Sequence, residues 1–239
     1  MDLTKWNWQI GEKFENGISA FYNDLYVFSP AHNRWTRYTS PSAPLPRSSH
    51  QMAVHPLTGN MYLFGGTCLF PSYLSIGEFS SPKGNTFYHY SDLHMLNPQS
   101  RQFTKIQTSG PSPSARSGHR IIFWRHYLLL FGGFHDTSSI TKYHNDLWVF
   151  DTIEEKWTEI KPVGGRSPEP RSGFTFLPSM DGGVLLGGYA KVKASAGKLR
   201  GMVFNDIWVV KMATDLTQVR WERRRKAPFA PAYWVLKSA

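Results

Sequence analysis

Arginine and aspartate recur at fixed places in the chain, which makes them the first candidates for chemistry. Three arginines each precede a serine and stand 16 to 18 residues before a Gly-Gly pair, and an aspartate lies in each of four segments of the type Asn-Asp-Leu: Arg47, Arg116, Arg171, Asp24, Asp92, Asp146 and Asp206. Charged groups beside aromatic rings suggest a binding or catalytic site. A catalytic group is needed once, however, whereas a repeated unit needs its internal contacts in every copy. We therefore predict that these side chains are buried and satisfied by hydrogen bonds within or between the units.

Nine histidines and one cysteine raise the question of a metal site. His50 and His119 share one position of the repeat, where the third unit has Phe174, so a ring that packs is the favoured interpretation. No two histidines have the spacing of a zinc site, and Cys68 has no partner cysteine. We predict no metal and no cofactor. A single cysteine also excludes an internal disulfide framework and fits a reducing compartment.

Positive charge is concentrated near the carboxyl end. The chain has 27 Lys and Arg against 17 Asp and Glu, and segment 191–226 alone holds 10 basic and 3 acidic residues. Such an excess attracts RNA or anionic lipid, or it is a solvated strand edge that resists aggregation, which is the simpler interpretation. No apolar stretch is long enough to cross a membrane, and the first residues lack the apolar segment of a signal peptide. We expect a cytoplasmic protein, without excluding the nucleus.

Repeated segments define the elements that must hold these side chains. Apolar runs end at each Gly-Gly pair, and a large ring follows each Asp-containing segment: Trp35, Phe103, Trp157 and Trp221. Residues 127–131, YLLLF, do not alternate polar and apolar, which indicates a strand buried on both faces. Each unit predicts four short strands: after Arg-Ser, before Gly-Gly, at Asn-Asp-Leu and around the ring. Such units predict an all-β fold, a β-propeller whose blades pack face to face.

At this point the chain resembles a known family. Arg-Ser-Gly-His (116–119), the strand ending in Phe-Gly-Gly (131–133), Asn-Asp-Leu-Trp-Val-Phe (145–150) and the following Trp are similar to the kelch repeat, over roughly residues 11 to 223. Segments 77–93, 114–120, 128–139, 187–201 and 220–226 further resemble one widespread eukaryotic subfamily, called kelch domain-containing protein 4 in animals and kelch repeat-containing protein 3 in fungi. The resemblance implies a protein–protein interaction role in the cytosol.

Some propellers of this class are enzymes, so the enzyme hypothesis needs a test. Members that resemble galactose oxidase cross-link a tyrosine to a cysteine at copper, and only Cys68 is available here; iron-dependent specifier proteins resemble Glu-x3-Asp-x3-His, and no Glu starts such a run. Motifs of serine hydrolases, phosphate-binding loops and zinc proteases are also missing from the sequence. We predict that the protein is not an enzyme. Service as the receptor of a ubiquitin ligase, which some kelch proteins perform, ranks low because no ligase-binding domain is visible.

The segments after the Gly-Gly pairs, 67–90, 134–143 and 189–203, vary in length and composition. In a propeller such loops emerge on one face, and loops on a rigid scaffold often carry binding. Aromatic and basic side chains together are typical of interface hot spots, although rings here also suit a role in capping the blades. The leading hypothesis is a non-catalytic scaffold that binds a protein partner through these loops. The candidate binding residues are Phe79, Phe87, Tyr88, His89, Phe134, His135, Tyr143, Tyr189, Lys191, Lys193, Lys198 and Arg200.

The repeat is incomplete at both ends. Counting from Arg-Ser to the ring gives blades 47–107, 116–160 and 171–222, preceded only by a half-blade, 21–38. Propellers have at least four blades. We therefore predict that residues 1–239 form a partial kelch propeller of about three and a half blades, a fragment of a larger one, with irregular ends at 1–20 and 227–239.

Unequal spacing predicts an insertion in the first complete unit. From the second glycine to the next Asp the units take 26, 13 and 18 residues, and removing residues 67–77 would bring the first value to 15. We expect this segment to be a poorly ordered excursion that exposes Leu69, Phe70 and Leu74. The alternative is a binding loop specific to one lineage.

Overall fold

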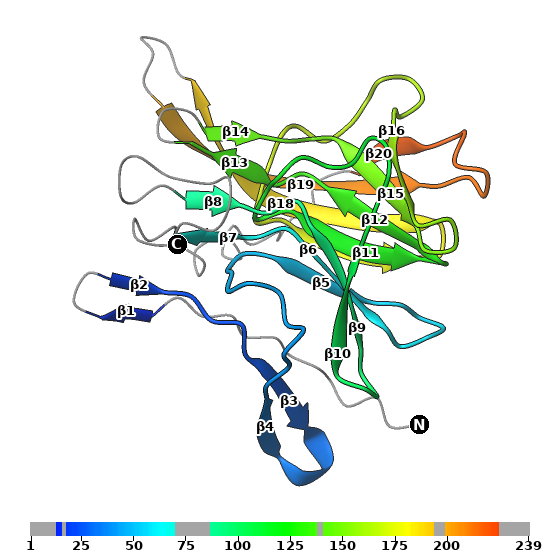
Figure 1. Ribbon diagram of the computed structural model, residues 1–239. Coiled ribbons are helices and arrows are strands. Elements are labelled where there is room, and N and C mark those ends of the chain that lie inside the picture. Colours follow the sequence, from blue (N-terminus) through cyan, green and yellow to red (C-terminus); the bar gives the residue numbers. More distant parts are fainter. Residues whose placement is uncertain (1–12, 16–17, 70–86, 138–140, 194–198, 225–239) are drawn as a thin grey trace.

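Three four-stranded antiparallel sheets and one two-stranded sheet make up the body of the molecule (Figure 1). The computed structural model describes residues 13–15, 18–69, 87–137, 141–193 and 199–224. Within each four-stranded sheet the strands follow the order of the sequence. This arrangement confirms the predicted all-β propeller blades, and the 3-10 turn η1 (Pro30–His32) is the one helical element among the described residues.

Each blade takes its four strands from one sequence repeat. The first blade contains β5 (Gln51–Val54), β6 (Met61–Phe64), β9 (Leu93–Asn97) and β10 (Gln102–Ile106). The second contains β11 (Arg120–Trp124), β12 (Tyr127–Phe131), β15 (Leu147–Asp151) and β16 (Lys156–Ile160). The third contains β17 (Thr175–Ser179), β18 (Gly182–Lys193), β19 (Leu199–Lys211) and β20 (Arg220–Arg224), and the half-blade contains β3 (Leu25–Ser29) and β4 (Arg34–Tyr38).

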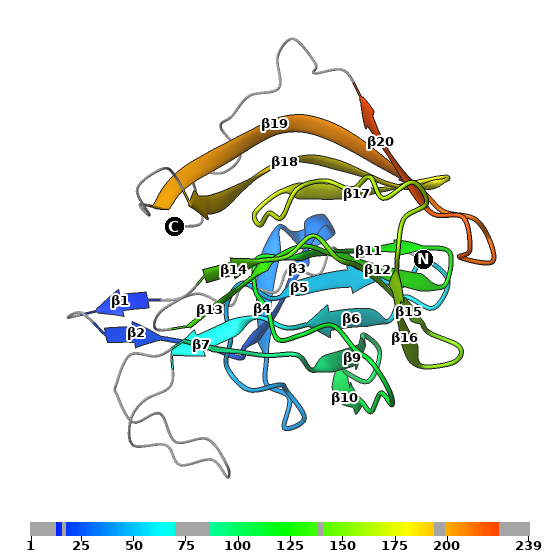
Figure 2. The same cartoon turned by 90° about the horizontal axis from the view of Figure 1, so that it is seen from above.

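Strand β12 shows why the apolar run at 127–131 has no polar alternation. Leu128 and Leu130 belong to a core shared with the first blade, whereas Leu129 and Phe131 belong to a core shared with the third. Figure 2 shows the second blade between the other two. Successive side chains of a strand point to opposite faces, so a blade in the middle buries both sets.

The first strand of the second blade, β11, lies against the first strands of the other two blades, β5 and β17. Backbone hydrogen bonds link the turns before them: the Gly118 amide donates to the Ser49 carbonyl and the Gly173 amide to the Gly118 carbonyl, both at 3.1 Å. These turns set the spacing of the blades about the axis.

A Gly-Gly pair follows the second strand of the first and second blades and interrupts the regular pairing of β18 in the third, because no side chain fits there. Gly132 and Gly133 have φ of 65° and 92°, a region that suits glycine. A Cβ on Gly133 would stand 2.8 Å from the Ser117 carbonyl oxygen and from the Cβ of His119. The chain therefore turns here within contact of the Arg-Ser segment.

Beyond each Gly-Gly pair the chain forms a hairpin, where the sequence had predicted a loop. These hairpins are β7 (Thr67–Leu69) with β8 (Phe87–His89), β13 (Phe134–Asp136) with β14 (Thr141–Tyr143), and the paired outer ends of β18 and β19. All project from one side of the molecule (Figure 1). Loops were predicted because short strands without apolar periodicity carry little sequence signal.

Two predictions about irregular segments need correction. Within 1–20, expected to be irregular, β1 (Lys13–Glu15) pairs with β2 (Ile18–Ala20) and occupies the hairpin position before the half-blade. Within 67–77, expected to be an excursion, Thr67 exchanges backbone hydrogen bonds of 2.7 and 2.8 Å with Ser48, and Thr67–Leu69 pairs with β8. These ladders hold the described parts of both segments, Lys13–Glu15 with Ile18–Ala20 and Thr67–Leu69. Residues 1–12, 70–86 and 227–239, with Phe70 and Leu74, lie outside the described residues.

Candidate interaction surface

The candidate surface is the hairpin face, which we define as the hairpins β7–β8 and β13–β14 together with the outer ends of β18 (188–193) and β19 (199–204). Of the predicted binding residues, ten lie on this face: Phe87, Tyr88, His89, Phe134, His135, Tyr143, Tyr189, Lys191, Lys193 and Arg200. Phe79 and Lys198 lie outside the described residues. The three predicted segments therefore contribute to one surface, although through strands and not through loops.

Five predicted residues form a continuous row of rings across the three blades. The His89 ring lies 4.7 Å from that of His135 and 5.8 Å from that of Phe134. The Phe134 ring lies 5.7 Å from that of Tyr143, which in turn contacts Tyr189 at 6.4 Å. All but His89 are partly exposed. The row gives the face a rigid aromatic floor.

His89 is buried and joins the first blade to the second. Its Nε2 accepts a hydrogen bond from the Asp136 amide at 3.1 Å, so Nδ1 carries the proton and donates to the Ser117 hydroxyl at 3.1 Å. Burial, together with the nearby His135, lowers the pKa of His89 to about 4. The imidazole is therefore neutral at physiological pH and serves to hold the hairpins, and it offers no free nitrogen to a ligand.

Basic and apolar side chains stand around this floor. Phe87, Lys191, Lys193 and Arg200 are exposed. Where the second and third blades meet, an open depression of about 270 Å³ has Tyr143 and Lys191 on its wall. Its other lining residues are Thr141, Glu169, Pro170, Ala190, Val192 and Met202. The depression is open, unlike the concave pockets that enclose most of a small ligand.

Sequence reasoning missed Glu169 and Thr141 in this depression. Glu169 stands two residues before Arg171, as Ser114 stands before Arg116, and the carbonyl of each accepts a hydrogen bond from the arginine Nε at 3.0 Å. The position of Glu169 in the repeat, two residues before the buried arginine, could therefore have identified it from the sequence. Thr141 gave none, because its position follows from the length of the β13–β14 turn.

Among the described residues, the exposed cations of segment 191–226 fall into two groups. Lys191, Lys193 and Arg200 lie on the hairpin face, and Arg220, Arg223 and Arg224 lie on β20. Strand β20 pairs with residues 207–211 of β19, at least seven residues from Arg200. Lys191 pairs with Gly201, six residues from that segment, so at about 3.3 Å per residue the two groups are roughly 20 Å apart along the strand. Two separate groups of cations do not provide the single continuous basic surface that RNA or anionic lipid would bind.

The repeated arginines are anchors of the fold, as predicted. Arg116 donates to both carboxylate oxygens of Asp146, at 2.6 and 2.8 Å, and to the Gly132 carbonyl at 3.1 Å. Arg47 with Asp92 and Arg171 with Asp206 repeat this geometry. Burial raises the pKa of Asp146, but the hydrogen bonds and charge of Arg116 outweigh it, and the net pKa is lowered.

Rings complete these anchors. The Arg47 guanidinium stacks 3.9 Å from the centre of the Tyr90 ring, and Arg171 stacks 3.8 Å from that of Phe204. Those rings stand two residues before the aspartates, at the position that Tyr22 and His144 hold in the other two units. The charges of the three complete blades are thus bound to each other, whereas Asp24 of the half-blade pairs with the exposed Arg37.

The described residues lack the features of two other classes of site. They contain no helix that is long and apolar enough to cross a membrane. Nor do they bring three or more His, Cys, Asp or Glu side chains together around a point where a metal ion would be held.

Comparison with known proteins places this architecture. The family model described as "KLHDC2/KLHL20/DRC7 Kelch-repeats domain" matches residues 10–232. The chain is 26% identical over 180 residues to host cell factor homolog hcf-1 of Caenorhabditis elegans, covering 70% of this chain and 21% of that protein. It is 28% identical over 192 residues to tip elongation aberrant protein 1 of Schizosaccharomyces pombe, covering 79% and 14%.

A human relative and a solved structure extend the comparison. Human kelch domain-containing protein 3 is 23% identical over 159 residues, covering 66% of this chain and 38% of that protein. The solved structure of YjhT superposes with a TM-score of 0.60 at 17% identity, covering 86% of this chain and 60% of that one. The chain therefore spans between about a seventh and three fifths of these proteins. The superposition shows a shared fold.

Proposed function

The chain belongs to the kelch-repeat family, and we propose that it is a non-catalytic scaffold that binds another protein through its hairpin face. Kelch-repeat domains generally mediate protein–protein interaction. The observation that carries the proposal is the row of partly exposed rings, bordered by exposed Lys191, Lys193 and Arg200, on one side of a rigid set of blades. Aromatic anchors with a basic rim are typical of protein interfaces.

The charges of the hairpin face favour a partner segment of a particular chemistry. The exposed cations next to the depression have no acidic partner among the ion pairs of the described residues. Glu169 is the one acid that lines the depression with them. A segment with apolar side chains and one or more carboxylates would bury rings on the floor and complement the rim.

The use of the repeated charges supports the absence of catalysis. The three aspartates of the blades are held by arginines, and the buried histidines His89 and His144 have pKa values lowered to about 4 by burial. A general acid or base needs a pKa near the working pH and access to substrate. These groups have neither.

Affinity capture with matched variants tests the proposal. One variant carries Phe87→Ser, Lys191→Glu and Arg200→Glu, all exposed on the hairpin face; the control carries Leu57→Ser, Lys156→Glu and Arg220→Glu, exposed at the opposite end of the strands. Both change the net charge equally. We expect proteins captured by the unchanged chain to be retained by the control and reduced at least tenfold by the first variant, with both variants giving the unchanged circular dichroism spectrum. Equal retention by both variants would contradict the proposal.

A further inference from the structure

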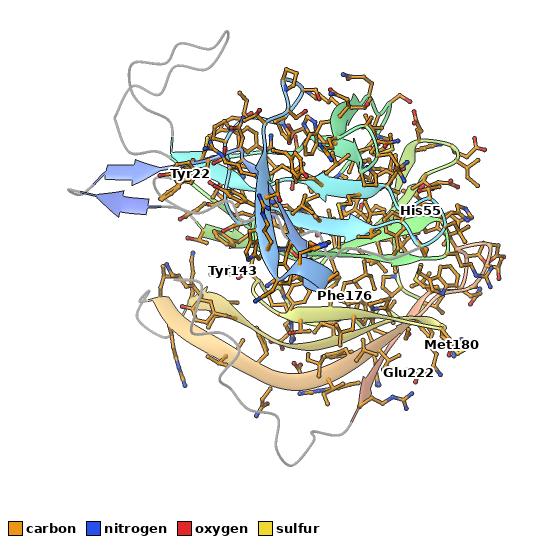
Figure 3. All side chains as sticks on the ribbon, turned by 90° about the horizontal axis from the view of Figure 1, so that it is seen from below. Tyr22, His55, Tyr143, Phe176, Met180 and Glu222 are labelled. Atoms are coloured by element: carbon orange, nitrogen blue, oxygen red, sulfur yellow. The ribbon has the colours of Figure 1, made fainter. Side chains whose placement is uncertain are left out.

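Three adjoining depressions form one groove, the side groove, along the third blade. The depression of the hairpin face shares Glu169 and Met202 with a second one of about 220 Å³, and the second shares Trp208 and Arg223 with a third. Figure 3 shows residues from its two ends: Tyr143 beside the outer ends of β18 and β19, and Glu222 on β20, toward the other end of the blade. The groove therefore extends from the hairpin face down the side of the molecule.

The side groove lies where the second and third blades meet. Trp208 and Trp221, which line it, belong to the core that the third blade shares with the second. The opposite wall is the connection between β16 and β17, which is held to the second blade: the Asn145 side-chain amide donates to the Ser167 hydroxyl and to the Pro168 carbonyl, both at 3.3 Å. Both walls are therefore fixed by contacts between two complete blades.

Cations stand at the two ends of the side groove and an acid stands between them. Lys191 lines the first depression, and Arg166 and Arg223 line the third. Glu169 lines both the first and the second. Among the ion pairs of the described residues, Lys191 and Arg166 have no carboxylate partner. Arg223 comes only within 4.0 Å of Asp206. The ends of the groove thus offer positive charge to a ligand.

These charges are not part of the repeated construction of the blades. Strand register matches Arg223 of β20 to Glu159 of β16 in the second blade. Lys191 stands three residues after its Gly-Gly pair, where the second blade has Asp136. Side chains that hold a blade together recur from unit to unit, as the arginine anchors do. A charge that is reversed at the corresponding position is not required by the fold, so binding is the better explanation.

Strand register also gives the distance between the two ends. Lys191 pairs with Gly201 and Arg223 pairs with Trp208. These two partners are seven residues apart on β19, which is about 23 Å at about 3.3 Å per residue. An extended ligand chain has the same rise per residue, so two of its carboxylates reach both ends of the groove when they are about seven residues apart.

We propose that the side groove binds an extended acidic segment of a partner protein, whose carboxylates about seven residues apart pair with Lys191 at one end and with Arg166 and Arg223 at the other. Apolar side chains between them pack along Met202. A carboxylate at the centre is disfavoured, because it would face Glu169. This inference rests on the proposed function, since the groove begins on the hairpin face, and it adds the spacing of the charges that the partner carries.

The test selects peptides from a displayed library of random twelve-residue sequences, with the full chain as bait. We expect the enriched sequences to carry acidic residues about seven apart with apolar residues between them. We expect Arg223→Glu to weaken the binding of these peptides at least tenfold, as measured by fluorescence anisotropy. Arg220→Glu is the matched control and is expected to bind as the unchanged chain does, because Arg220 is exposed on the same strand and lines none of the three depressions.

Arg223→Glu is expected to fold, because the second blade carries Glu159 at the corresponding position; Arg166→Glu, in the exposed connection, is the second variant. No enrichment, enriched peptides without the acidic spacing, or peptides that bind Arg223→Glu as tightly as Arg220→Glu would overturn the proposal. Peptides that need Phe87 and Lys191 but not Arg223 would also overturn it, and they would leave the binding role of the hairpin face intact.

Discussion

Each buried arginine of the blades connects three parts of its unit. The Arg116 guanidinium binds the Asp146 carboxylate and the Gly132 carbonyl, while its Nε binds the Ser114 carbonyl. The arginines were predicted to be structural because they recur, and this was correct. Trp148 donates to the same Asp146 carboxylate at 2.8 Å, and His94 has the corresponding contact with Asp92. The sequence did not indicate these hydrogen bonds, because a Trp in a strand is usually interpreted as a core residue.

Removal of a buried arginine should be far more costly than removal of an exposed one. We expect Arg116→Ala to lower the free energy of unfolding by about 3 kcal/mol, because it leaves the Asp146 carboxylate without its main partner. Arg37→Ala breaks the pair with Asp24 in the half-blade, where the Arg37 side chain is 57% exposed against 1% for Arg116, and should change stability little. Urea unfolding followed by fluorescence measures both. Similar effects of the two substitutions would refute this ranking.

His119 should make the protein sensitive to acid. Its ring packs 5.4 Å from Phe64, as Phe174 packs 5.7 Å from Phe131 in the next unit, and both ring nitrogens are buried without a hydrogen-bond partner. Burial, with Arg116 nearby, holds the pKa of His119 well below its usual value of about 6.5. The unfolded chain therefore binds more protons than the folded chain below about pH 6.5, so stability falls as the pH is lowered.

Substitution with the residue of the next repeat separates this contribution. We expect His119→Phe to keep the fold and to lose less stability than the unchanged chain between pH 6.5 and pH 4. His50, with a pKa lowered to about 3, and His89 and His144, with pKa values lowered to about 4, contribute to the remaining slope in that window. Unfolding midpoints in urea at several pH values measure the difference. An unchanged slope would show that His119 does not titrate on unfolding.

At the scale of elements, the strands of the blades follow from the sequence and the hairpins do not. YLLLF predicted a strand buried on both faces, and β12 has that property. The prediction of an irregular insertion at 67–77 is wrong for Thr67–Leu69, which pairs with β8, because it came only from comparing the lengths between Gly-Gly and Asp; residues 70–77 lie outside the described residues. Thr67 bridges to Ser48 as Phe134 bridges to Ser117 and as Tyr189 bridges to Ser172, so these three residues hold equivalent positions. Backbone pairing of this kind does not require a particular residue type, and the sequence therefore did not reveal it.

The Gly-Gly turn gives a prediction with an internal control. Gly133→Ala should cost several kcal/mol, because its Cβ would lie 2.8 Å from backbone and side-chain atoms at 117 and 119 and its φ is 92°. Gly164 has a similar φ of 77° with nothing within 4 Å of its Cβ, so Gly164→Ala should show the backbone strain alone, about 1 kcal/mol. Thermal unfolding of the two variants measures the gap. Equal losses would mean that close packing at the turn is unimportant.

The whole molecule has a graded order of protection. The second blade is covered on both faces, whereas β3 and β4 form a two-stranded sheet whose face with Trp35 is open. Short local repeats predicted the blades and the half-blade, because each unit carries its own pattern. The hairpins meet on one face because strands far apart in the sequence pack together. No single segment of the sequence indicates this; it was predicted only from the expected propeller fold.

Hydrogen exchange should reveal this order. We expect amides of β12 to exchange at least a hundredfold more slowly than those of β3 and β4, because opening the second blade disrupts two cores and opening the half-blade disrupts part of one. Mass spectrometry of peptides from the two regions measures the rates. Equal protection would show that the half-blade is as firmly held as the blades.

A consequence for evolution follows from the two faces of β12. One face of a blade fits the unit before it and the other fits the unit after it, so a single repeat encodes both surfaces of a contact that its own duplicate can reproduce. Copying the gene segment for one repeat therefore adds a unit that already matches its neighbours. Changes in the number of repeats need no coordinated substitutions elsewhere in the chain, and the arginine anchor inside each unit is inherited with it.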